Sequence, residues 1–222
     1  MRTSQTRMEA ITTNLSNLST PGYKKVGTSV RAFQVPGQPV GANELVTRVQ
    51  VDFVQGNLQA SSNPYHLGLQ GPGFFAVEGL DGELYTRRGT FRVDDQGVLQ
   101  TDEGFPIAWQ GRGGKIDAVG APVTIDGSGV VRQGNNNIGT LRIVDFDRPD
   151  KLEQIGGGYF QATPETRETP TEAVIYQSTL ETSNVAGVEE LVNMINVQRS
   201  FESATQMMKM VDESYKRLNQ AR

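Results

Sequence analysis

Few residues in this sequence have the types and spacing that catalysis needs. His66 is the only histidine among 222 residues, which excludes a metal site with several histidine ligands and leaves at most one Ser/His pair. Beside Pro64 and Tyr65, a single histidine is more typical of a turn than of a catalyst. Cysteine is absent, which removes thiolate nucleophiles, thiolate metal ligands and disulfides.

Two polar clusters resemble ligand-binding motifs but lack their decisive features. Residues 111–115 have the composition of a phosphate-binding loop, but they lack the four-residue spacer before Gly-Lys, and Ile116 stands where Ser or Thr is required. Asp145, Asp147 and Asp150 are close in the chain without the spacing of a calcium loop. We interpret the first cluster as a hairpin connection and the second as a solvated turn. The sequence therefore predicts no catalytic, cofactor-binding or metal-binding residues, no cofactor and no enzymatic activity.

Aromatic residues in the middle of the chain allow an alternative function. They could form a platform that stacks on sugar rings, which would make the protein a β-rich carbohydrate-binding module on an oligomerising helical stalk. In strands at these spacings, however, aromatic residues belong more often to a hydrophobic core. The residues concerned are Phe74, Phe75, Tyr85, Phe91, Phe105 and Trp109.

The composition is that of an ordinary globular protein. The chain is 36% apolar and 21% charged with a net charge of −4, so it has no basic bias towards nucleic acid. No segment approaches the roughly 20 apolar residues of a membrane-spanning helix, and no apolar run near the start suggests a cleaved signal peptide. We therefore expect no nucleic-acid partner and no membrane insertion.

The dominant pattern lies at the end of the chain. From about Ala186 to Gln220 there is no proline, and apolar residues recur three and four positions apart in alternation, which predicts one amphipathic helix with a coiled-coil seam. At about 1.5 Å per residue, this helix is on the order of 50 Å long. Further apolar residues widen the stripe at its start, so we expect that part to pack against more than one neighbour. The seam consists of Met194, Val197, Phe201, Ala204, Met208, Val211, Tyr215 and Leu218, and the widening residues are Val188, Leu191, Val192 and Ile195.

A shorter helix with the same spacing is predicted at the start of the chain. It ends near Thr20, because Pro21 disfavours helical backbone at the residue before it and Pro21-Gly22 is a turn signal. With about 18 residues it spans roughly 27 Å and can cover only about half of the longer helix. Since the repeat is already in phase at Met1, we expect further residues to precede it in the native chain. The stripe consists of Met1, Ser4, Met8, Ile11, Leu15 and Leu18.

Between the helices the sequence predicts an antiparallel β domain. Short alternating runs, among them residues 45–53, 84–93 and 173–180, are separated by hairpin-turn sequences at 81–82, 95–97, 126–127 and 134–137. The expected fold is thus mainly β with flanking α, in which the two terminal helices form a coiled-coil-like assembly region. Its parts are an N-terminal assembly helix (1–22), an extended linker (23–44), an antiparallel β domain (45–180) and a long C-terminal assembly helix (181–222). The uncovered half of the long seam is left for residues before Met1 or for other chains.

Three blocks of sequence resemble the flagellar rod and hook family. The first is residues 13–24 (TNLSNLSTPGYK), where an Asn-rich helix end runs into a Thr-Pro-Gly-Tyr-Lys turn. The second combines residues 71–77 (GPGFFAV) with residues 85–91 (YTRRGTF). The third comprises residues 180–185 (LETSNV), 189–195 (EELVNMI) and 198–202 (QRSFE). Their order and spacing match over nearly the whole chain, and the lack of a large inserted outer domain favours a rod subunit over the hook protein.

The resemblance implies a structural subunit of the bacterial flagellar basal-body rod. Such a subunit is exported by the flagellar type III apparatus without a cleaved signal peptide and assembles in the periplasmic rod, the drive shaft that transmits torque. Its partners would be other rod subunits, including the hook-side rod protein, in a self-assembling helical array. We predict that the assembly interface consists of Met8, Ile11, Leu15, Leu18, Met194, Val197, Phe201, Met208, Val211, Tyr215 and Leu218.

Overall fold

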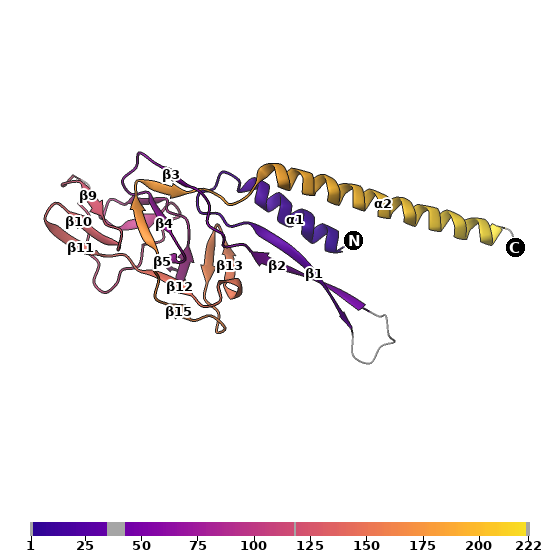
Figure 1. Cartoon of the computed structure of the whole chain (residues 1–222), viewed down its shortest axis with the longest axis horizontal. Coiled ribbons are helices and arrows are strands. Elements are labelled where there is room, and N and C mark those ends of the chain that lie inside the picture. Colours follow the sequence, from indigo (N-terminus) through magenta and orange to yellow (C-terminus); the bar gives the residue numbers. More distant parts are fainter. Residues whose placement is uncertain (1, 35–42, 118, 221–222) are drawn as a thin grey trace. The chain divides into compact units, whose positions relative to one another are not determined.

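The computed structural model describes residues 2–34, 43–117 and 119–220 (Figure 1). The chain divides into two compact units, which we call the terminal unit (Met1–Leu18, Val26–Val51 and Val185–Arg222) and the β unit (Ser19–Lys25 and Asp52–Asn184). The protein is mainly β with a helix near each end, so the expected fold class is confirmed. None of the described helices is long and apolar enough to cross a membrane.

The largest sheet of the β unit has six antiparallel strands. Their order across the sheet is β13-β14-β6-β5-β12-β15, so strands far apart in the sequence become neighbours. A short 3₁₀ helix, Pro149–Lys151, follows β12. The strand bounds are β5 Phe74–Gly79, β6 Gly82–Thr86, β12 Ile143–Phe146, β13 Glu153–Gly156, β14 Tyr159–Gln161 and β15 Glu168–Thr169.

Smaller antiparallel sheets complete the β unit. One has the order β11-β10-β9, and three are pairs in which β17 joins β3, β16 joins β4 and β7 joins β8. All four predicted hairpin turns are confirmed, because each connects two strands that pair with one another. The bounds are β3 Leu58–Ala60, β4 Leu67–Gln70, β7 Phe91–Val93, β8 Leu99–Thr101, β9 Val123–Ile125, β10 Val130–Gln133, β11 Asn136–Thr140, β16 Val174–Gln177 and β17 Thr179–Glu181.

Two of the predicted continuous runs are interrupted. Residues 84–93 divide between β6 and β7. Between these strands the backbone of Gly89 packs against the backbone of Leu67, so closely that a Cβ on Gly89 would lie 1.6 Å from the Leu67 carbonyl oxygen. Residues 173–180 divide between β16 and β17 at Ser178, whose φ of 54° is the left-handed conformation. Each half then pairs with a different strand, β4 or β3. Residues 111–115 also differ from expectation, since they lie in a long loop rather than between two paired strands.

The core of the β unit is built from the apolar faces of these sheets. Phe75, Phe91, Leu67 and Val131 are at most 1% exposed, and the rings of Phe75 and Phe91 meet edge to face at 5.1 Å. Phe74 and Tyr85 are also buried, whereas Phe105 and Trp109 pack against the core half-buried; together with Phe75 and Phe91, these are the six aromatic residues of the sugar-platform hypothesis. These side chains are therefore core residues.

The terminal unit consists of two helices and a hairpin. Helix α1 (Arg2–Ser16) packs against α2 (Gly187–Gln220) and against the hairpin of β1 (Val26–Gln34) and β2 (Asn43–Val51) (Figure 1). The expectation of an extended linker over 23–44 is thus wrong for β1, and residues 43–51 pair in the terminal unit rather than in the β unit. Residues 35–42 lie outside the described part of the chain.

Asn14 explains why a segment with weak hydrophobic alternation becomes β1. Its Oδ1 accepts the backbone N–H of Val26 at 2.8 Å, and its Nδ2 donates to the carbonyl oxygen of the same residue at 2.9 Å. Asn14 is 1% exposed and Val26 is 7% exposed. A side-chain amide therefore satisfies the backbone polar groups at the start of the strand, which short-range sequence patterns do not reveal.

Glu103 makes the stability of the β unit depend on pH in the acidic range. Although partial burial raises its pKa, hydrogen bonds from Tyr159 and from backbone, together with the charge of Arg88, leave the pKa of Glu103 below its usual range. The Tyr159 hydroxyl donates to Glu103 at 2.6 Å. Because the folded pKa is lowered, the stabilisation from Glu103 is present above the unfolded pKa of about 4.3 and is lost as the pH falls through the folded value.

We therefore expect Glu103→Gln to reduce the difference in melting temperature between about pH 5 and pH 3. Glu103 is 38% exposed, so solvent screening limits the effect to below about 1 kcal/mol. Thermal denaturation of both proteins across this range measures it, with Glu153→Gln on an exposed strand as the matched control. Parallel pH profiles for wild type and Glu103→Gln would contradict the assignment.

Candidate assembly interface

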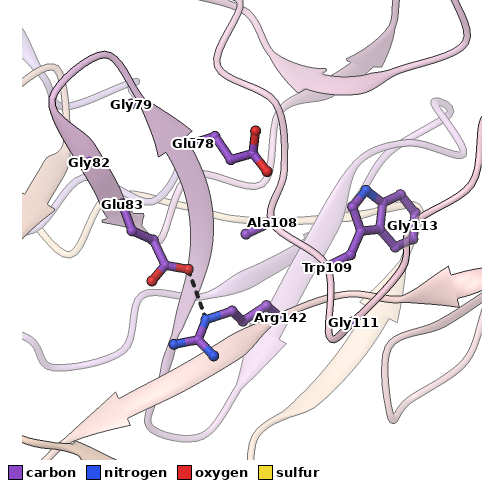
Figure 2. Close-up of a pocket in the computed structure, with 9 residues that line it drawn as sticks. All are labelled: Glu78, Gly79, Gly82, Glu83, Ala108, Trp109, Gly111, Gly113 and Arg142. Carbon is purple, nitrogen blue, oxygen red and sulfur yellow. Dashed lines mark hydrogen bonds and ion pairs between the residues drawn. The ribbon is translucent and has the colours of Figure 1, made fainter.

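A pocket on the β unit does not have the groups of an active site. This pocket of about 620 Å³ contains an Arg142–Glu83 ion pair at 2.8 Å (Figure 2). Arg142 also binds Glu168 at 2.7 Å, so its charge is already neutralised. Trp109 lines the same pocket, but a Cβ on Gly113 or Gly139 would lie within 2.7 Å of its ring. The indole is therefore covered by backbone and is not a free stacking platform.

His66 and the acidic cluster have local structural roles. The Oγ of Ser61 lies 2.7 Å from Nδ1 of His66 and also accepts the N–H of Asn63 at 3.3 Å, so the pair holds a turn. Asp145 lies in β12, and Asp147 accepts the backbone N–H of Arg167 at 3.0 Å. Among the described residues, no three metal-ligating side chains form a cluster.

The terminal unit, in contrast, exposes a large amount of apolar surface along α2. Leu18 lies next to Gly187, and Met8 lines a groove with Val197 and Phe201, so α1 and the first part of α2 run antiparallel. Beyond Val197, every described side chain of α2 up to Arg217 is exposed except the half-buried Thr205. The expectation that the shorter helix covers only about half of the longer one is confirmed (Figure 1).

The predicted interface residues divide along this boundary. Ile11 and Val197 are buried at 4% and 5%, and Met8, Leu15 and Met194 are half-buried, so these five contribute to packing within the chain. The exposed members are Leu18 (42%), Phe201 (47%), Met208 (46%), Val211 (52%) and Tyr215 (64%). The side chain of Leu218 lies outside the described part of the structure. We call Phe201, Met208, Val211 and Tyr215 the distal seam.

A groove marks the place where the covered and exposed parts of α2 meet. It has a volume of about 400 Å³ and is lined by Ser4, Gln5, Met8, Val197 and Phe201. Met8, Val197 and Phe201 are its apolar lining residues, and Phe201 is also the first residue of the distal seam. The distal seam therefore continues from the groove without a polar break, because these residues recur at helical spacing.

The start of α2 carries a second exposed apolar face. Val188 is 77% exposed and Ile195 is 48% exposed, with Leu191 and Val192 between them at 52% each. At about 100° per residue, Val188 and Ile195 lie on the side of the helix opposite Val197. These residues therefore form a separate face, rather than widening the seam as the sequence suggested.

Comparison with known proteins connects this geometry to a family. Residues 68–133 match the model of the flagellar hook protein FlgE/F/G D1 domain, and residues 176–221 match the flagellar basal body rod FlgEFG protein C-terminal model. The chain is 34% identical over 212 residues to the flagellar basal-body rod protein FlgF of Caulobacter vibrioides, covering 90% of this chain and 85% of the relative. The chain belongs to the FlgE/F/G family of flagellar rod and hook proteins.

Other rod/hook relatives match over nearly their whole length. FlgF of Escherichia coli is 33% identical, with 96% of this chain and 91% of the relative covered. FlgG of Buchnera aphidicola is 30% identical, with 97% and 94% covered. The chain is accordingly a structural subunit of the flagellar basal-body rod and not an enzyme, as the sequence predicted, and its location is the flagellar basal body.

All three family blocks of the sequence contribute to one buried ion cluster in the β unit. Lys24, Arg87 and Glu181 are at most 5% exposed. The Nζ of Lys24 donates to Glu181 at 2.6 Å and to the carbonyl oxygen of Val54 at 2.9 Å, while an Arg87 nitrogen lies 3.5 Å from the other Glu181 oxygen. Glu181 also accepts the N–H of Gly56 at 2.8 Å.

The charges in this cluster are unequal. Burial lowers the pKa of Lys24 and of Arg87, while the carboxylate of Glu181 acts in the opposite direction on both. One buried anion therefore balances two buried cations. This cluster could not be predicted from the sequence because Lys24 and Glu181 are 157 residues apart, and the only indication of it was that each residue lies within a family block.

Proposed function

We propose that the distal seam is the surface through which this rod subunit assembles. In the rod, these apolar residues pack against helices of neighbouring subunits to form an inner tube, and the β units pack outside it. The observation that carries this proposal is the exposure of apolar side chains at consecutive seam positions from Phe201 to Tyr215. Water-exposed apolar surface of this regularity is typical of a helix that awaits a partner.

We further propose a symmetry for the array. The seam residues of one subunit meet a different part of the next, so the contact is head to tail and builds an open helical assembly rather than a closed dimer. The partners are other rod subunits, including the hook-side rod protein. Such an array is a periplasmic drive shaft that transmits torque, and we infer that its subunits leave the cell through the flagellar type III apparatus without a cleaved signal peptide.

Within the family, we propose that the chain occupies the proximal, FlgF-type position. Its short central domain and the identities of 34% and 33% to two FlgF proteins support this choice over the FlgG-type position. Expression in strains lacking either subunit tests it. Restored motility in the FlgF-deficient strain alone is the expected result, whereas restoration of the FlgG-deficient strain alone would reassign the position.

Fractionation tests membership in the rod directly. Basal bodies purified from cells that produce the tagged chain should retain it after washing at high salt, because the predicted contact is apolar and weakly screened. A chain recovered only in the soluble periplasmic fraction of motile cells would contradict the proposal.

Before assembly, the distal part of α2 should open more readily than the β unit. An isolated helix of this length is marginally stable in water, and residues 198–217 have almost no buried side chains. We expect a broad-specificity protease to remove this segment from the free monomer while residues 67–101 remain intact, as mass spectrometry of the fragments would show. Equal resistance of both regions would show that the seam is already covered in the monomer.

A further inference from the structure

The chain crosses from one unit to the other at four positions. The β-unit residues at three of these positions are hydrogen-bonded to one another. At three of the four passages, the β-unit residue at the boundary is Lys25, Asp52 or Asn184. The Oδ1 of Asn184 accepts the Lys25 N–H at 2.7 Å, and its Nδ2 donates to the Asp52 carbonyl oxygen at 2.9 Å. The Asp52 N–H donates to the Lys25 carbonyl oxygen at 2.8 Å.

Only an amide side chain can make this set of contacts. Asn184 uses its acceptor on Lys25 and its donor group on the carbonyl oxygens of both Asp52 and Val54, each at 2.9 Å. An aspartate of the same shape keeps the acceptor but loses both donor hydrogens, and it places a carboxylate against two carbonyl oxygens. Replacement by Asp therefore separates hydrogen bonding from packing.

The buried ion cluster binds the same three segments. Lys24 reaches the carbonyl oxygen of Val54, and Glu181 accepts the N–H of Gly56. Each of the segments 22–25, 52–56 and 181–184 is therefore bonded to the other two. A pull on any one of these segments therefore acts on hydrogen bonds to the other two.

We propose that Asn184 is the positioning residue that ties these three connections together, so that a load on the terminal unit reaches the β unit through all of them. This inference rests on the proposed function, because it assumes that the terminal unit is the assembled part of a rod subunit. The hydrogen-bonded segments themselves lie wholly within the β unit.

Hydrogen exchange of the purified full chain tests the local part of this proposal. We expect Asn184→Ala to accelerate exchange of the Lys25 amide about tenfold, through loss of its hydrogen bond, with the Phe75 amide unchanged. Asn184→Asp keeps the acceptor for the Lys25 amide but loses both donors, so it should instead accelerate exchange of the Asp52 amide, which donates to the Lys25 carbonyl oxygen. Asn135→Ala, which removes an exposed amide from a hairpin turn, is the control. An Asn184→Asp protein with wild-type exchange would show that packing, not hydrogen bonding, holds the segments, and would overturn the proposal.

Swimming in media of increasing viscosity tests the load-bearing consequence in cells. Cells with Asn184→Ala should contain as many basal bodies as wild type and lose speed at high viscosity, while Asn135→Ala cells keep theirs. If exchange is accelerated and swimming still matches the control, load does not pass through this residue and the proposal fails. If the wild-type chain itself is absent from basal bodies, the proposed function fails instead, and the exchange result decides the local part alone.

Discussion

Val211→Asp is expected to exclude the subunit from the rod while leaving both units folded. Val211 is 52% exposed in the free chain, so the new carboxylate remains hydrated there. In the assembled seam the same carboxylate would be buried among apolar side chains, at a cost of several kcal/mol, which reduces incorporation more than about tenfold. The amount of tagged subunit in purified basal bodies, with swarming motility as the second readout, measures the effect.

Two comparisons make this result specific. Gln206→Asp adds the same charge to a polar position of α2 and should be incorporated like wild type, whereas Phe201→Asp, on the distal seam, should be excluded like Val211→Asp. Circular dichroism should show an unchanged melting temperature of the β unit in all three variants. If Val211→Asp unfolds the free chain, this side of α2 belongs to an internal core and the interface lies elsewhere.

Glu181→Gln is expected to produce the largest loss of stability in the β unit. The substitution keeps the shape of the side chain but removes the one carboxylate of this cluster, which leaves Lys24 and Arg87 without it as buried cations at 2% and 5% exposure. Breaking a buried ion pair by removing one partner costs about 3 to 5 kcal/mol. For a protein of this size, the melting temperature should fall by roughly 10 °C or more.

The opposite substitution should be tolerated much better. Lys24→Met leaves Glu181 paired with Arg87, so one buried anion still faces one buried cation. Thermal denaturation of both variants, with Glu153→Gln on an exposed strand as the reference, gives the comparison. Equal melting temperatures for Glu181→Gln and Glu153→Gln would mean that the cluster is neutralised by other means.

Local patterns predicted much of this fold. Two helices followed from apolar residues at helical spacing, and four hairpins followed from Asp-Gly, Asp-Gln-Gly and Gly-Asn sequences, because both kinds of pattern report on residues close in the chain. The pairing of β1 with β2 and the division at Ser178 did not follow. They depend on the amide of Asn14 and on a left-handed residue with no glycine to mark it.

The functional surfaces likewise include one that the sequence could predict and others that it could not. The seam from Phe201 to Tyr215 could be read directly, since a regular apolar stripe is a property of one helix. How much of α2 is covered by α1 could be estimated only from the lengths of the two helices. The structure shows that the covered part of α2 ends just after Val197. The bonds of Asn184 and Glu181 could not be predicted from the sequence, because their partners lie 94 to 159 residues away.

A single introduced cysteine offers the most direct measurement of whether the distal seam is buried on assembly. Because the chain has no cysteine, Val211→Cys carries its only thiol. A water-soluble maleimide should label this thiol readily in the free monomer, and labelling should fall at least about tenfold in intact basal bodies, with Asp95→Cys on an exposed hairpin turn as the reference for access of the reagent. Equal labelling of Val211→Cys in monomer and basal body would contradict assembly through this seam.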